Sequence, residues 1–242
     1  MRRPVFVRGA ILLVVASLSA AAPAAPQARN QPRAGAVVPG GARPAAGPDV
    51  GDPAPALRLT RMGGEEVALS SLWAGRPLLV VLGSCTAPEF RERAAAIGRF
   101  SGEFGGDIGV ALVYVLEAHP ADAAGPFGPR PDITQTNVAA GCSIPVHKDL
   151  AARREAAKLA TRTLSLEVPM FVDGMDDAAW KAFGKPVAGA FLIDREGYIV
   201  TPQVSYNPAE MEANARLLLE AQLPPPPPPA PTPPPKPGSG GR

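Results

Sequence analysis

Cysteine, histidine and aromatic residues are all scarce in this chain of 242 residues, which contains two Cys, two His and 5% aromatic residues. The thiol and imidazole side chains match no compact metal-ligand spacing, so we expect neither a metal site nor a cofactor. A strong charge of one sign is lacking too, because 24 Lys and Arg nearly balance 22 Asp and Glu. Without a basic stripe or interleaved aromatic residues, the chain lacks the surface that nucleic-acid phosphates require, and we expect no nucleic-acid partner.

Long hydrophobic runs are also missing. The apolar run at residues 10–18 is too short to cross a bilayer as a stable helix, so we expect no stable membrane span. This run follows a start that contains Arg2, Arg3 and Arg8 and precedes small residues, which is the three-part layout of a secretory signal. We therefore predict a signal peptide at residues 1–25 and export to the periplasm or out of the cell. Loss of the three arginines takes the formal net charge from +2 to −1.

Proline and glycine, by contrast, are abundant, with 31 and 25 residues, and they concentrate at the two ends of the chain. Residues 26–50 have the Pro, Ala, Gly and Arg composition of a flexible linker. Residues 223–242 form a proline-rich tail that we predict to be disordered, as a spacer or as a ligand for a proline-reading partner. The remaining residues 51–222 are enough for one globular domain.

Two short apolar runs, residues 78–82 and 110–116, predict buried strands of a parallel sheet. Between them, apolar side chains recur at helical spacing on one face, which predicts a helix that packs on that sheet. These side chains belong to Phe90, Ala94, Ile97, Phe100 and Phe104. The three elements together form a βαβ unit.

Further elements follow in an alternating order. We predict an extra edge strand at residues 67–69, helices near 149–160 and 176–183, a strand at 170–172, a hairpin of strands 190–193 and 198–200, and a last helix capped by Asn207. This order resembles that of the thioredoxin-like fold, an α/β fold in which helices flank a central mixed sheet.

The start of the first helix carries a chemical hypothesis. Thr86 and Glu89 have the spacing of a capping box, which would make Ala87 the first helical residue. Free amides and the positive end of the helix dipole favour an anion there, such as a thiolate. Ala87 cannot carry that charge, whereas Cys85 lies just outside the cap and would feel part of the field.

Three motifs stand out in the core of the domain. Residues 83–90 read GSCTAPEF, residues 114–122 read YVLEAHPAD and residues 144–147 read IPVH. They resemble the motifs GSCT-Sec-PPF, YIEEAHPSD and IPQH of the iodothyronine deiodinase family. The similarity covers about residues 78–159, and the later hairpin resembles redoxins more generally.

The resemblance implies an active site at the first of these motifs. In the family, a selenocysteine attacks the iodine of a thyroid hormone, and a histidine, a glutamate and a neighbouring cysteine assist. Ala87 stands here at the position of the selenocysteine, the missing nucleophile. The chain keeps the other site residues, which are Cys85, Thr86, Tyr114, Glu117, His119 and His147.

Two cysteines are enough for redox chemistry or for a single structural bridge. Cys85 is either a thiolate nucleophile or a small, semi-buried residue. Cys142 either resolves an oxidised Cys85 through a disulfide, which requires Cα atoms within about 7 Å, or is a lone structural or surface thiol. Glu117 and His119, two residues apart at a strand end, should point to the same side as an acid/base pair or as an ion pair.

Two functions of different classes follow from these residues. The first is an exported thiol oxidoreductase in which Cys85 attacks a disulfide, peroxide or halogenated substrate, Cys142 resolves, and Glu117 and His119 handle protons. Its partners would be a thiol reductant or redox partner protein and a small-molecule or disulfide substrate. The second is a non-catalytic binding module that retains the pocket for a small anion or an aromatic ligand. Residual deiodination through Cys85 is a third alternative.

Overall fold

The computed structural model describes residues 47–73 and 75–222. The predicted signal peptide, most of the predicted linker and the proline-rich tail lie outside these residues. Within them, no helix has both the length and the apolar character that crossing a membrane demands.

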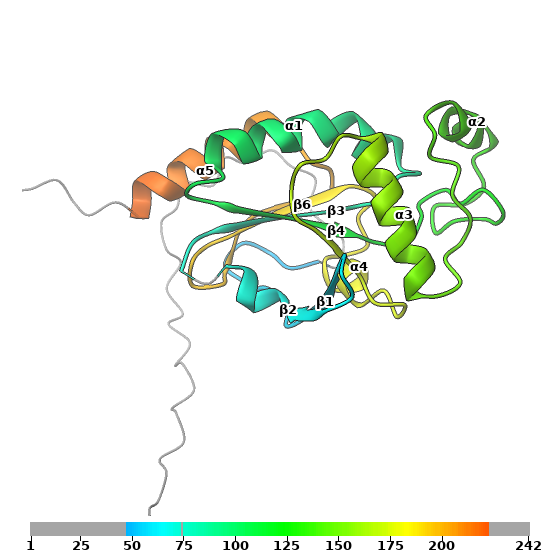
Figure 1. Cartoon of the computed structure of the whole chain (residues 1–242). Coiled ribbons are helices and arrows are strands. Elements are labelled where there is room, and N and C mark those ends of the chain that lie inside the picture. Colours follow the sequence, from blue (N-terminus) through cyan, green and yellow to red (C-terminus); the bar gives the residue numbers. More distant parts are fainter. Residues whose placement is uncertain (1–46, 74, 223–242) are drawn as a thin grey trace, which may run out of the picture. The chain divides into compact units, whose positions relative to one another are not determined.

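Seven strands form one mixed sheet in the order β2-β1-β5-β4-β3-β6-β7. The central strands β3, β4 and β5 run parallel, and the remaining neighbours pair antiparallel (Figure 1). The strands are β1 (Arg58–Arg61), β2 (Glu66–Ala68), β3 (Leu78–Gly83), β4 (Gly109–Tyr114), β5 (Met170–Val172), β6 (Gly189–Ile193) and β7 (Ile199–Gln203).

Helices cover both faces of this sheet (Figure 1). Buried side chains of α1, α3 and α5 pack on one face, and those of η1 and α4 pack on the other. The helices are η1 (Leu69–Leu72), α1 (Pro88–Phe104), α2 (Pro131–Ala139), α3 (Leu150–Thr163), α4 (Ala178–Ala182) and α5 (Pro208–Gln222).

Strand β3 shows how the sequence builds the two cores. Its side chains alternate between the faces, so that Leu79 and Val81 join the core under α1. Leu78, Val80 and Leu82 join the core on the opposite face. An unbroken apolar run is therefore what a central strand with two covered faces requires. This arrangement confirms the predicted α/β class with a central mixed sheet flanked by helices.

Most element boundaries agree with the sequence patterns to within a few residues. The predicted edge strand at 67–69 is β2 at 66–68, and Asn207 accepts a hydrogen bond from the backbone N–H of Glu210 at the start of α5. The patterns predict neither β1 nor α2. β1 pairs with β2 and β5, and α2 contacts the site described below.

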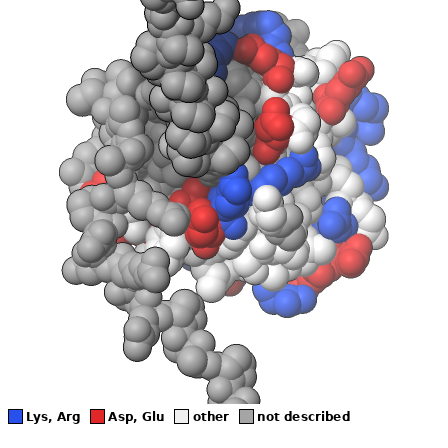
Figure 2. All heavy atoms as spheres, turned by 90° about the vertical axis from the view of Figure 1, so that its left-hand side faces the viewer, with Lys and Arg blue, Asp and Glu red and all other residues white. Residues whose placement is uncertain are grey.

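Charged side chains of both signs are interspersed on the face shown in Figure 2, with white surface between several of the charged groups. Exposed ion pairs also occur among the described residues, such as Arg58–Glu66 and Arg216–Glu103. The visible described residues thus form no extended surface of a single sign on that face.

Candidate redox site

The candidate site lies where two parallel strands end side by side. β3 and β4 pair in register, with Gly83 opposite Tyr114, so the segments that follow both strands leave the same edge of the sheet. Ligand and reaction sites of open α/β sheets form at this carboxyl edge. A hydrogen bond joins the two segments directly, because the backbone N–H of Ala118 donates to the Ser84 side chain, at 3.1 Å from Oγ.

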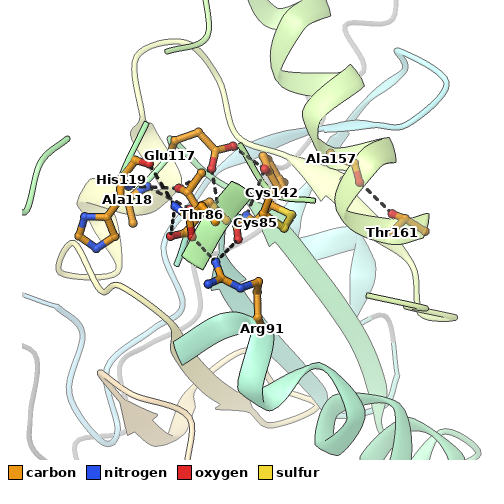
Figure 3. Close-up of a disulfide and its surroundings, with 12 residues drawn as sticks. Cys85, Thr86, Arg91, Glu117, Ala118, His119, Cys142, Ala157 and Thr161 are labelled. Carbon is orange, nitrogen blue, oxygen red and sulfur yellow. Dashed lines mark hydrogen bonds between the residues drawn. A yellow bond between two sulfur atoms is a disulfide. The ribbon is translucent and has the colours of Figure 1, made fainter. Parts of the chain in front are cut away.

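Cys85 and Cys142 form a disulfide at this edge (Figure 3). Their Cα atoms are 5.4 Å apart, which satisfies the limit of about 7 Å for such a bridge. Both residues are completely buried. Of the two readings that the sequence left open for Cys142, the structure therefore shows the paired one.

Glu117 is the centre of a buried hydrogen-bond network beside the disulfide. Its Oε2 accepts from the backbone N–H of Thr86 at 3.2 Å and from the Thr86 hydroxyl at 2.7 Å. Its Oε1 accepts from the Tyr114 hydroxyl and from His147 Nε2, the latter at 3.0 Å. The Tyr114 hydroxyl in turn accepts the backbone N–H of Cys85 at 3.2 Å. One carboxylate thus holds the cysteine loop at two residues, directly at Thr86 and through the Tyr114 hydroxyl at Cys85.

Arg153 determines which nitrogen of His147 carries a proton. Arg153 Nε, always a donor, lies 3.1 Å from His147 Nδ1, so this imidazole nitrogen must accept. The proton of the neutral ring therefore sits on Nε2 and points at Glu117. Arg153 is itself held by the carbonyl of Gly174 at 2.5 Å and by Asp177 Oδ1 at 2.8 Å. Nothing in the local sequence distinguishes Arg153 from the other arginines of α3.

Burial keeps the Tyr114 hydroxyl protonated. The pKa of Tyr114 is raised well above its ordinary value, first by loss of solvation and then by the negative charge of Glu117. The phenol is accordingly a lasting donor to the carboxylate.

The prediction that Glu117 pairs with His119 is wrong, because the Glu117 carboxylate forms its hydrogen bond with His147 instead. β4 ends at Tyr114, so the strand alternation on which the prediction relied does not extend to these residues. Figure 3 shows the His119 ring directed away from the disulfide. Only its backbone N–H reaches the network, donating to Thr86 Oγ1 at 3.1 Å. Burial lowers the pKa of the His119 imidazole.

The predicted capping box at the start of α1 is also wrong. The helix begins at Pro88, and Ala87 is the capping residue without a side-chain cap. The Thr86 hydroxyl instead donates to Glu117 and accepts the backbone N–H of His119, so it bonds the segment after β4 rather than the first turn of α1. Ala87, at the position of the missing nucleophile, is completely buried.

Arg91 and Asn137 form a polar clamp over the cysteine loop, and sequence reasoning missed both. Arg91 Nη1 donates to the carbonyl of Cys85 and to Asn137 Oδ1, each at 2.7 Å. Asn137 Nδ2 donates to the carbonyls of Thr86 at 3.2 Å and His119 at 3.4 Å. The clamp therefore joins α1 to α2 across the loop that carries the disulfide.

An open pocket of about 350 Å³ lies beside the first turn of α1. Glu89, Lys185, Val187 and Ser205 are among its lining residues. The described residues contain no group of His, Cys, Asp and Glu side chains arranged to hold a metal ion.

Residues 46–216 match the protein-family model for iodothyronine deiodinase, which is well over half of the chain. The chain belongs to the iodothyronine deiodinase family. The thyroxine 5-deiodinase of Gallus gallus is 32% identical over 149 residues, which are 61% of this chain and 53% of that protein. The type II iodothyronine deiodinase of the same species is 29% identical over 123 residues, which are 50% of this chain and 41% of that protein. The chain thus spans about half the length of these curated relatives.

Solved structures confirm the thioredoxin-like fold. An uncharacterized conserved protein from Geobacillus kaustophilus has a TM-score of 0.51 and 13% identity, over 72% of this chain and 83% of that chain. A thiol:disulfide interchange protein from Bacteroides sp. has a TM-score of 0.50 and 14% identity, over 72% of this chain and 93% of that chain. At these identities the similarity concerns the fold alone.

Within this member of the iodothyronine deiodinase family, the structure collects most of the predicted site residues into one network. The network contains Cys85, Thr86, Tyr114, Glu117, Cys142 and His147. It leaves the His119 ring outside. In this iodothyronine deiodinase family member, a disulfide lies next to the position that alanine occupies at residue 87.

Proposed function

We propose that the protein is an exported thiol–disulfide oxidoreductase that uses Cys85 and Cys142 as its redox pair. The observation that carries this proposal is the disulfide itself, which lies at the carboxyl edge of the parallel strands and next to the Glu117 network. A disulfide is an oxidant for two thiols, so this site has a complete two-electron chemistry without a cofactor.

The exchange reaction balances with a dithiol partner. A thiolate of the partner attacks one sulfur of the Cys85–Cys142 bridge, the S–S bond breaks, and the electron pair leaves on the other cysteine sulfur. The second thiol of the partner then attacks the mixed disulfide. The partner is oxidised to a disulfide, and Cys85 and Cys142 are reduced to thiols. The reverse sequence reduces a substrate disulfide.

Cys85 is the proposed nucleophile of the reduced protein. It lies three residues before Pro88, the first residue of α1, at the end of the helix whose dipole stabilises a thiolate. Its backbone is fixed by Tyr114 and Arg91 on opposite sides. Cys142 is the proposed resolving residue, because it is disulfide-bonded to Cys85 in this structure.

Glu117 and His147 are the proposed proton-handling pair. The His147 Nε2 proton points at the Glu117 carboxylate, which also bonds Thr86, the residue next to Cys85. We assign to this network the uptake of the proton that is released when a thiol becomes a thiolate. His119 is the proposed ligand-side residue, since its ring lies outside the network.

The test replaces each cysteine separately and measures reduction of a small aromatic disulfide by dithiothreitol. We expect Cys85→Ser to abolish turnover and Cys142→Ser to accumulate a mixed disulfide on Cys85, visible by mass spectrometry. The exposed variant Glu92→Gln, on the surface of α1, should retain the wild-type rate. Unchanged turnover in Cys85→Ser would exclude the proposed function.

A second candidate is a non-catalytic binding module, which the complete burial of the disulfide and the alanine at position 87 favour. The redox potential separates the two functions. A structural bridge has a reduction potential below about −300 mV and resists reduction by a glutathione buffer, whereas an exchanging pair equilibrates with that buffer. Deiodination through Cys85 is tested by iodide release from an iodophenol with excess reductant, and we expect none because position 87 has no nucleophile.

A further inference from the structure

Helix α2 contacts the rest of the domain through a small surface. Of its nine residues, only Ile133 and Asn137 are buried. Figure 1 shows this helix at the right-hand edge, beyond α3 and away from the sheet. A segment that buries few apolar side chains opens at a low free-energy cost. The position of α2 therefore depends on polar and covalent links.

The links converge on Asn137. Its side chain bonds the carbonyls of Thr86 and His119 and the guanidinium of Arg91. Its own carbonyl accepts the backbone N–H of Cys142 at 2.8 Å. One residue of α2 thus holds both cysteine segments, the first through its side chain and the second through its backbone.

The disulfide has no solvent access in this arrangement, because Cys85 and Cys142 are both 0% exposed. Thiol exchange requires the attacking sulfur to reach a cysteine sulfur, and its rate depends on access. The closed structure is therefore unreactive, and some part of the surroundings must move before exchange. β3, β4 and α1 contribute many side chains to the apolar cores, whereas α2 contributes none to either core and buries only Ile133 and Asn137, so α2 is the adjoining element that we expect to move.

The chain offers turning points at both ends of α2. Gly128 has a φ of 80° and Gly141 a φ of 67°, conformations that glycine adopts without strain. Gly141 directly precedes Cys142, so rotation there changes the path of the chain between α2 and the disulfide.

We propose that α2 is a gate over the Cys85–Cys142 disulfide and that Asn137 is the positioning residue that holds it closed. The purpose of the gate rests on the proposed function, because only an exchanged disulfide needs controlled access. Reduction removes the covalent link between the cysteines and leaves the Asn137 hydrogen bonds as the main hold on α2. The redox state of the site consequently sets how readily a partner reaches Cys85, which is a partner thiol for the oxidised protein and a partner disulfide for the reduced protein.

The test measures how fast dithiothreitol reduces the disulfide of the full-length oxidised protein, from the thiols released in each variant. The two thiols of dithiothreitol become its cyclic disulfide while Cys85 and Cys142 become thiols. We expect Asn137→Ala to raise the reduction rate about tenfold or more, because it loses three hydrogen bonds, one of them to a charged group. Val138→Ala is the matched control, since the neighbouring Val138 is 61% exposed, and it should react at the wild-type rate.

A reduction rate in Asn137→Ala within twofold of wild type would overturn the gate. Hydrogen exchange on oxidised Asn137→Ala shows whether faster reduction comes from opening of α2 or from unfolding of the whole domain. Faster exchange confined to α2 supports the gate, whereas an equal loss of protection in β3 and β4 overturns it. These results need no substrate turnover, so they are independent of the Cys85→Ser test: unchanged activity there refutes the proposed function and leaves the gate standing.

Discussion

Replacing Glu117 by Gln tests whether the network beside the disulfide requires a carboxylate. The substitution keeps the size of the side chain and exchanges one acceptor oxygen for an NH₂ donor. All four groups that face Glu117 donate to it, two on each oxygen. The new amide nitrogen must therefore face donors, whichever way the side chain is turned.

Neither orientation of the glutamine satisfies the site. With the amide nitrogen at the Oε2 position, it faces the backbone N–H of Thr86, which cannot become an acceptor. With the nitrogen at the Oε1 position, it faces His147 Nε2, whose proton is fixed there because Arg153 occupies Nδ1. Hydroxyl groups can rotate, but one N–H donor loses its acceptor in each case.

The expected cost is about 3 kcal/mol of unfolding free energy, from one lost charge-assisted hydrogen bond and one buried donor left without an acceptor. Urea unfolding of the oxidised protein at neutral pH measures it. The exposed Glu92→Gln variant on α1 is the control and should change stability by less than about 0.5 kcal/mol. If Glu117→Gln were as stable as that control, the inferred donor arrangement, including the proton on His147 Nε2, would be refuted.

Two further predictions concern stability and pH. The disulfide closes a loop with a sequence separation of 57, and chain entropy then gives a loss of about 4 kcal/mol in unfolding free energy on reduction; urea curves of oxidised and reduced protein that differ by less than about 1 kcal/mol would contradict it. Because burial lowers the folded-state pKa of His119, its contribution to stability is present above its unfolded pKa of about 6.5 and is lost as the pH falls through the folded-state value. Glu89, Arg91, Arg130 and Asp132 are the charged neighbours that modulate it. His119→Gln should lose less stability than wild type between pH 7.5 and pH 5.0, and equal losses would count against this assignment.

Elements with strong periodicity were predictable from the sequence because their buried faces are continuous. β3 is apolar on both faces, and α1 carries its buried residues at helical spacing. α2 buries a single apolar residue, Ile133, so it has no stripe to recognise. β1 pairs on both sides, yet its four residues include only two buried ones, Leu59 and Thr60, which is too short a signal for strand alternation.

The site shows where local rules fail. Thr86 has the spacing of a helix cap, but its hydroxyl donates to Glu117, 31 residues later, and accepts the backbone N–H of His119. Glu117 and His119 are close in sequence, yet the chain leaves the strand before reaching them. The family motifs contain most of the residues that the structure brings together, whereas their partners Arg153, Arg91 and Asn137 depend on packing between distant elements and carry no pattern of their own.

The pairing of Cys85 with Cys142 also makes formation of the disulfide depend on assembly of the sheet. Cys85 follows β3, and Cys142 comes after α1, β4 and α2 have intervened. In an unfolded chain, bringing together two residues this far apart carries an entropic cost that the native sheet removes in advance. The sulfurs meet readily only once β4 lies beside β3 and the following segment has folded back over the ends of both strands. An oxidant acting on newly made protein would thus close the bridge preferentially in chains whose central sheet is already complete.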